Sequence, residues 1–300
     1  MFRHLLAPLD GSHLAESVLP AVAALTGRLD AHVTLLHVVE RDAPALVHGE
    51  RHLTRPAEAE AYLAEVAQRL ESRGVLVDAV VHDDSGDVAD AIAQHAAGLG
   101  ADLVVLCTHG RAGFRGLLFG RVAQQVLRSG TTPVLLLRPA VGGREQPFAC
   151  RRLIVPLDGS ESAETALPAA TMIARACAAE VFLIWVVPTV ATISDERTAA
   201  TKLMPTAAAA LLDAEAGQAA AYLGQERSRV ERDGVAAWAA VERGDTVRVL
   251  LDAAAKHDVD LIVMATHGRS GVSAVWAGSV AARMAAHSTR PILFIRVPRP

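Results

Sequence analysis

The chain has 300 residues, which is the length of about two ordinary domains. Its formal net charge of -4 gives no electrostatic reason to expect a nucleic-acid partner. Hydrophobic residues make up 51% of the chain but aromatic residues only 4%, so the cores must be built from Val, Leu, Ile and Ala. These values are typical of a soluble, mildly acidic globular protein.

Membrane segments and metal sites are not indicated. No run reaches the roughly 18 apolar residues that span a bilayer, and the first residues lead directly into a strand pattern rather than a signal peptide. Cys107, Cys150 and Cys177 have no C-x-x-C spacing, which favours reduced thiols and a cytoplasmic location. The 12 histidines lack the spacing of a zinc site, so no protein-bound metal and no membrane partner is expected.

Short apolar runs alternate with helical patterns along the first half of the chain. Near-continuous Val, Leu and Ile runs predict strands of a parallel sheet, and the intervening patterns predict helices on both of its faces, in a doubly wound α/β fold. The predicted strands are Leu5–Leu9, Val33–Val39, Val75–Val81, Leu103–Leu106 and Val134–Leu137. The first predicted helix follows Ser12 and has apolar residues on one face from Ala15 to Leu25. The other predicted helices are Pro56–Arg73, Val88–Ala97 and Val122–Arg128.

The second half repeats the first. Leu5 to Ser12 matches Leu153 to Ser160, and Pro133 to Arg138 matches Pro291 to Arg296. A period of about 150 residues is too long for a solenoid, so it indicates a tandem domain duplication. The predicted domains are residues 1–142 and 148–300.

Ligands of doubly wound sheets bind beyond the carboxyl ends of the strands, where the strand order reverses. Asp10 follows the first strand and can bond a ribose hydroxyl, while the backbone at Val38 can contact an adenine edge. Glycines after the fourth strand and the free N–H groups of the next helix can hold phosphate. The second copy offers the same features at Asp158, Val186 and Thr266 to Arg269. The sequence therefore predicts a nucleotide site in each copy.

The glycine spacing points to a family. It reads Ala265-x2-Gly268-x9-Gly278-Ser279 in the second copy and Cys107-x2-Gly110-x9-Gly120-Arg121 in the first. Both resemble the G-x2-G-x9-G-(S/T) pattern of the ATP-binding branch of the universal stress protein family. Three further features resemble that family: the Pro-x-Asp-Gly-Ser opening, the Thr-His-Gly-Arg loop and the closing Pro-Val/Ile-Leu strand. The resemblance occurs twice and covers essentially the whole chain.

The resemblance implies a stress-response regulatory protein that binds ATP. It also implies two five-stranded, Rossmann-like domains, similar to nucleotide α-hydrolases, that form an internal pseudo-dimer with adjacent antiparallel fifth strands. The favoured nucleotide-binding residues are Pro156, Leu157, Asp158, Val186, Met264, Ala265, Thr266, Gly268, Arg269, Gly278, Ser279 and Val280. The corresponding residues of the first copy are Pro8, Leu9, Asp10, Val38, Leu106, Cys107, Thr108, Gly110, Arg111, Gly120, Arg121 and Val122.

Both copies depart from the family pattern. Ala265 and Cys107 replace its first glycine, and Arg121 replaces its compact hydroxyl with a long cation. Arg121 could pair with a phosphate, or it could fold into the pocket and pair with Asp10. The second copy is therefore the favoured site, and binding by the first is left open.

No catalytic residue is predicted. His109 and His267 lie in the glycine loops, where a role in orienting the loop is preferred over a role as general base. The chain has neither a Walker lysine nor a carboxylate cluster for Mg²⁺, so any Mg²⁺ is expected to arrive with the nucleotide. The alternatives are a nucleotide-free interaction protein of the same family and a slow ATP hydrolase, and further homodimerisation is left open.

The second copy also carries an insertion between Val187 and Asp233. Residues 192–204 and the alanine-rich run 207–210 predict a loop that enters a long helix near the mouth of the second site. A lid and an ordinary surface loop are both compatible with this pattern.

Overall fold

The computed structural model describes residues 1–40, 46–47, 50–83, 86–108, 120–139, 147–192, 205–266 and 279–297. The chain forms two compact units. Unit 1 holds the first repeat together with residues 291–297, and unit 2 holds the rest of the described second repeat.

Unit 1 is built on the strands β1 (His4–Pro8), β2 (His32–Val38), β5 (Leu76–His82), β6 (Leu103–Cys107), β7 (Val134–Leu137) and β12 (Ile292–Arg296). Their order across the sheet is β5-β2-β1-β6-β7-β12. The pairs within the first repeat are parallel, whereas β12 pairs antiparallel with β7. β1, β2 and β6 are buried along most of their length, as expected for a parallel sheet covered on both faces.

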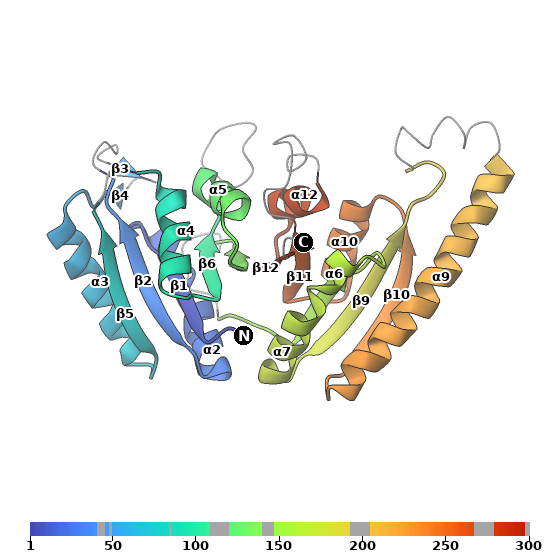
Figure 1. Cartoon of the computed structure of the whole chain (residues 1–300), viewed down its shortest axis with the longest axis horizontal. Helices are drawn as coiled ribbons and strands as arrows, with labels where there is room; N and C mark the ends of the chain where they lie inside the picture. The colour runs from blue at the N-terminus through green and yellow to red at the C-terminus, as the bar shows by residue number, and fades with distance from the viewer. Residues whose placement is uncertain are drawn as a thin grey trace. The chain divides into compact units, whose positions relative to one another are not determined.

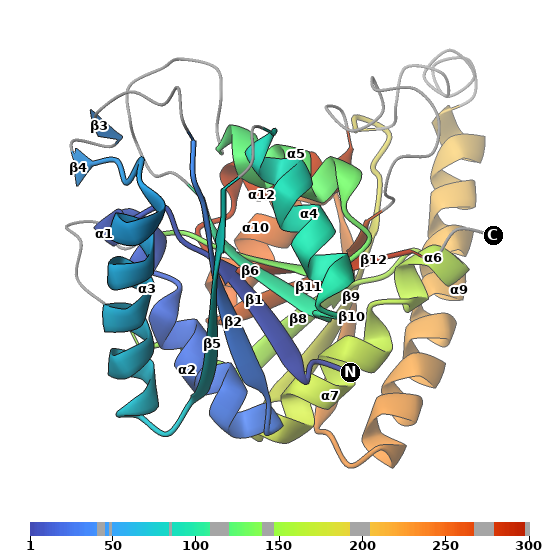
Figure 2. The same ribbon diagram turned by 60° about the vertical axis from the view of Figure 1, so that its left-hand side comes forward.

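Helices cover both faces of this sheet. In Figures 1 and 2, α2 (Leu19–Leu29) and α3 (Pro56–Glu71) lie on one face, and α4 (Val88–Gly98) and α5 (Arg121–Ser129) lie on the other. The face of α3 that meets the sheet is apolar and buried because Leu63, Val66 and Leu70 recur at helical spacing. The predicted doubly wound α/β fold is confirmed.

Unit 2 repeats this plan. Its strands are β8 (Arg152–Pro156), β9 (Glu180–Val187), β10 (Ala237–Arg243) and β11 (Leu261–Thr266), in the order β10-β9-β8-β11 with parallel pairing. The helices α7 (Leu167–Cys177) and α9 (Pro205–Arg232) cover one face, and α10 (Thr246–Lys256) and α12 (Val280–His287) cover the other (Figure 1).

The fifth strand of the second repeat belongs to unit 1. β12 pairs antiparallel with β7, the fifth strand of the first repeat, with Ile292 opposite Leu136. At the end of β12, the guanidinium of Arg296 donates hydrogen bonds to the carbonyl oxygens of Val126 and Gly130, at the end of α5. The prediction of adjacent antiparallel fifth strands in an internal pseudo-dimer is confirmed.

Two local features differ from the sequence expectation. The single helix expected after Ser12 is divided into α1 (His13–Glu16) and α2, because the ring of Pro20 conflicts with the carbonyl four residues earlier. The second repeat divides at the same place, into α6 (Glu161–Glu164) and α7. A small hairpin of β3 (Leu46–Val47) and β4 (Glu50–Arg51) lies between β2 and α3, where no strand was predicted.

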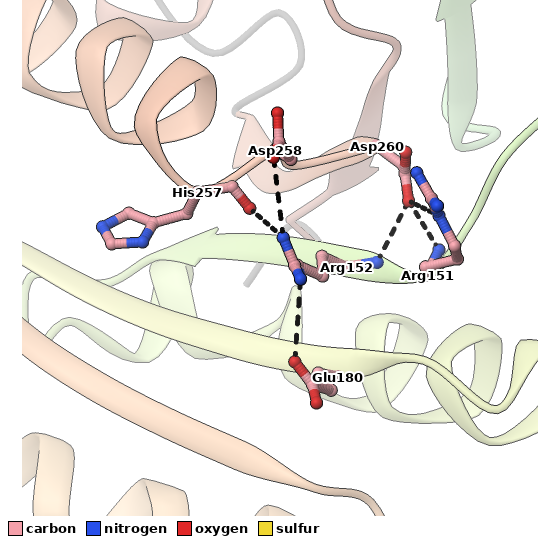
Figure 3. Close-up of polar contacts among 6 residues, drawn as sticks. All are labelled: Arg151, Arg152, Glu180, His257, Asp258 and Asp260. Atoms are coloured by element: carbon pink, nitrogen blue, oxygen red, sulfur yellow. Dashed lines mark hydrogen bonds and ion pairs between the residues drawn. The ribbon is translucent and has the colours of Figure 1, made fainter.

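A buried or partly buried aspartate fixes the start of the first strand in each repeat. In unit 2, Asp260 accepts hydrogen bonds from the backbone N–H groups of Arg151 (2.7 Å) and Arg152 (3.3 Å), as Figure 3 shows. In unit 1, Asp102 accepts the corresponding bonds from Arg3 (2.8 Å) and His4 (3.1 Å). These aspartates precede β11 and β6, so they lie at the amino ends of the strands and have a structural role.

The insertion in the second repeat contains the predicted long helix, α9. Leu212 and Ala219 of α9 are buried with Val187 of β9, so the helix is anchored on the sheet. The predicted loop at residues 193–204 lies outside the described part of the chain. None of the described helices is both long and apolar enough to cross a membrane.

Candidate functional site

A cavity of about 220 Å³ lies in unit 1, at the carboxyl ends of β1, β2 and β6. This is the place where doubly wound sheets bind their ligands. Most of the lining is apolar, and polar side chains come from Asp10, Glu40, His52 and Cys107. The predicted site residues that line it are Pro8, Leu9, Asp10, Val38, Leu106, Cys107 and Val122.

The carboxylate at the end of the first strand is held by its own turn. Asp10 Oδ1 accepts hydrogen bonds from the backbone N–H (2.9 Å) and the hydroxyl (2.6 Å) of Ser12, which in turn caps α1. In unit 2, Asp158 Oδ1 accepts the same two bonds from Ser160, at 3.0 and 2.6 Å. Each turn therefore places a carboxylate at the carboxyl end of a central strand.

The helix starts that follow the glycine loops differ between the repeats. Ser279 caps α12, and its Oγ accepts a hydrogen bond from the N–H of Ala282 at 3.2 Å. The helix α5 starts at Arg121, with Gly120 as its cap residue and no side-chain capping bond. Arg121 is exposed and is not part of the cavity lining. Its neighbour Val122 does line the cavity, so the amino end of α5 lies beside it.

Cys107 is the last residue of β6, the fourth strand of the first repeat, and Thr108 follows it. Burial raises the pKa of the Cys107 thiol to about 11, so the thiol is protonated near neutral pH. Its Sγ accepts a hydrogen bond from the Ser17 hydroxyl at 3.2 Å. The hydroxyl of Thr108 donates to the carbonyl of Leu137 at 3.2 Å and is buried, so it stabilises the sheet.

The described site residues of unit 2 gather at one edge of its sheet, at the ends of the adjacent strands β9, β8 and β11. They are Val186, Pro156, Leu157, Asp158, Met264, Ala265 and Thr266, with Ser279 and Val280 at the start of α12. The predicted residues Gly268, Arg269 and Gly278, together with His267, His109, Gly110 and Arg111, lie outside the described residues.

Sequence reasoning missed one side chain near the strand ends in each unit. His37 is buried in β2, where its Nδ1 lies 2.8 Å from the carbonyl oxygen of Leu9 and its Nε2 lies 3.3 Å from that of Leu53. Burial lowers the pKa of His37. Trp185 takes the corresponding place in β9 and packs against Gly159. A histidine inside an otherwise apolar strand run was the signal that could have drawn attention to this place.

Metal binding finds no support in the described side chains. They contain no group of three or more His, Cys, Asp or Glu that could hold a metal ion.

Comparisons with known proteins agree with this architecture. The sequence model of the Universal stress protein family matches residues 1–138 and 149–296. A universal stress protein structure from Archaeoglobus fulgidus is similar over 99% of both chains, with a TM-score of 0.72 and 19% identity. A relative from Synechocystis is 32% identical over 156 residues, which are 52% of this chain and 87% of the relative. One from Bacillus subtilis is 25% identical over 150 residues, which are 46% of this chain and 100% of the relative. Since the family model covers most of the chain in two copies, the chain belongs to the universal stress protein family, as a tandem member with two domains.

Proposed function

We propose that this chain is a stress-response regulatory protein that binds ATP at the carboxyl ends of its sheet strands. The observation that carries the proposal is the unit 1 cavity, whose apolar walls suit a base and whose Asp10 carboxylate can accept hydrogen bonds from ribose hydroxyls. The amino end of α5 lies beside the cavity and offers backbone N–H groups to phosphates.

The second domain is our favoured site for the triphosphate. Asp158 sits in a turn equivalent to that of Asp10, and Ser279 supplies a hydroxyl at the start of α12 where the first domain has Arg121. Arg121 is the reason to favour the second domain, because a long cation replaces a compact phosphate-binding group there.

The proposal includes the domain limits 1–142 and 148–300 and a cytoplasmic location. Cys107, Cys150 and Cys177 form no disulfide with one another, which supports that location because exported proteins commonly pair their cysteines. The alternative is a nucleotide-free interaction protein. It is favoured by the replacement of the first glycine of the motif by Cys107 in one repeat and by Ala265 in the other.

The test is isothermal titration of nucleotide-stripped protein with Mg-ATP, for wild type, Asp158→Ala and Asp10→Ala. Loss of a charged hydrogen-bond acceptor is expected to weaken binding about tenfold or more at the domain that is altered. Asp252→Ala, on the exposed face of α10, removes the same charge away from both sites and serves as control. Absence of saturable binding in the wild type would overturn the proposal and leave the interaction protein.

A further inference from the structure

The unit 1 cavity contains a polar pair that does not belong to the predicted motif. The side chain of His52 is only 3% exposed, yet neither of its ring nitrogens has a hydrogen-bond partner among the described residues. Oε1 of Glu40 lies 4.0 Å from Nε2, too far for a hydrogen bond, and the Glu40 side chain is 48% exposed. Both residues line the cavity. An imidazole buried without partners costs free energy, so a group that supplies a partner is stabilising there.

Contacts of the next residue hold His52 in place. The side chain of Leu53 packs over Gly11, so closely that a Cβ at Gly11 would lie 2.8 Å from Leu53 Cδ1. The carbonyl of Leu53 lies 3.3 Å from Nε2 of His37, whose Nδ1 is 2.8 Å from the carbonyl of Leu9. The backbone that carries His52 is therefore fixed over the ends of β1 and β2.

We propose that Glu40 and His52 form a subsite that recognises the polar edge of an amino-substituted purine, an adenine-type base, in the unit 1 cavity. This inference rests on the proposed function. Val38, the predicted backbone contact of the base, lines the same cavity two residues before Glu40. The Glu40 carboxylate accepts a hydrogen bond from the exocyclic amino group, and an N–H of His52 donates to a ring nitrogen beside that group.

The second domain does not repeat this pair. Trp185 stands at the position of His37, Pro188 stands at that of Glu40, and residues 188–204 contain no histidine. Selection for the amino group is therefore a property of the first domain. It is separate from the phosphate contacts on which the choice between the domains depends.

The test uses the full-length Asp158→Ala protein, stripped of nucleotide, so that the first domain is titrated. The ligands are ATP and purine riboside triphosphate, which lacks only the amino group. ATP is expected to bind about tenfold tighter, and Glu40→Ala is expected to reduce this preference to below about twofold. Glu71→Ala, exposed at the end of α3, removes the same charge elsewhere in unit 1 and should leave the preference unchanged.

A second readout reports on the histidine directly. The imidazole carbon–proton resonance of His52, assigned by its absence in His52→Gln, should shift when ATP is added and shift less with purine riboside triphosphate. An unmoved resonance at saturating ATP, or an undiminished preference in Glu40→Ala, would overturn the inference. If the wild type binds ATP and Asp158→Ala does not, the inference is overturned and the proposed function stands. No binding by the wild type would overturn the proposed function as well.

Discussion

Side chains that line the unit 1 cavity also stabilise the structure around it. Asp10 stabilises its turn through Ser12, and Cys107 accepts a hydrogen bond from Ser17 while it lines the cavity. The high pKa of Cys107, about 11, makes this thiol a poor nucleophile near neutral pH. It therefore acts as a small hydrophobic residue in the wall of the cavity.

We expect Cys107 to react slowly with iodoacetamide at pH 8, with a rate that rises until the pH approaches about 11, because only the thiolate reacts. The measurement is the labelling rate of the Cys150→Ser, Cys177→Ser double variant by mass spectrometry, across pH 7 to 11. Saturating ATP should slow the reaction further if the nucleotide fills the cavity. Rapid labelling at pH 7 would contradict this prediction.

Asp260 is the residue whose loss should destabilise unit 2 most clearly. Asp260→Ala removes the acceptor of two backbone N–H groups at the start of β8, and we expect a loss of about 2 kcal/mol in the free energy of unfolding. Urea denaturation measures it. The matched control is Asp258→Asn, because the Asp258 side chain is 77% exposed and lies 4.0 Å from Arg152 (Figure 3). Asn removes the charge and tolerates the left-handed backbone of this position, where φ is 47°. Equal effects of the two substitutions would show that the Asp260 contacts contribute little.

At the scale of elements, the starts of the first two strands are joined differently in the two repeats. In unit 1, His4 of β1 stacks on His32 of β2 with ring centroids 4.0 Å apart. In unit 2 the corresponding residues are Arg152 and Glu180, an ion pair of 3.8 Å (Figure 3). Unit 1 has a second histidine pair, in which His82 of β5 lies 3.0 Å from His95 of α4. Burial and the neighbouring imidazole lower the pKa of His4 and that of His95.

These pairs predict that unit 1 loses stability in mild acid. Below pH 6.5, the usual pKa of histidine, the unfolded chain binds protons at His4 and His95 that the folded protein resists, so the free energy of unfolding falls until the lowered pKa is reached. Above about pH 7, His4 and His95 are neutral in both states, so they do not make the free energy of unfolding depend on pH. Melting curves from pH 7.5 to 5 measure the effect, and His95→Gln should flatten the curve. A curve that is equally steep in His95→Gln would exclude this pair as the cause.

The strands and most helices could be predicted from the sequence because buried parallel strands are continuous apolar runs. β7 was predicted with its observed limits, Val134–Leu137. The break between α1 and α2 was missed because the apolar spacing continues through it, although Pro20 was the local sign of it. The position of His52 could not be predicted, since it depends on the β3–β4 hairpin and on the packing of Leu53 over Gly11.

At the scale of the whole molecule, the two repeats are not two independent sheets. β12 completes the sheet of unit 1 by covering β7, and its Arg296 is buried against the carbonyl oxygens that end α5. Burial lowers the pKa of Arg296 to about 10, which still leaves the guanidinium charged near neutral pH. That charge lies where the helix dipole favours a cation.

A chain that ends at Arg290 should therefore be less stable and should self-associate. Without β12, the buried apolar residues of β7 form an open strand edge that can pair with another copy. Light scattering after size exclusion is expected to give a larger mass than that of the intact protein. A thermal melting curve is expected to give a lower melting temperature for unit 1. Arg296→Ala keeps the strand and serves as the control, with unchanged mass. An unchanged mass of the shortened chain would contradict the expectation.

The position of β12 also has a consequence for biosynthesis. The ribosome makes β7 long before it makes residues 292–296, so the nascent first domain must wait for almost the entire second repeat before its sheet is closed. During that interval an apolar strand edge is available to chaperones and to neighbouring nascent chains. Slow codons or a pause within the second repeat would lengthen this exposure, so the yield of native protein should depend on the elongation rate there.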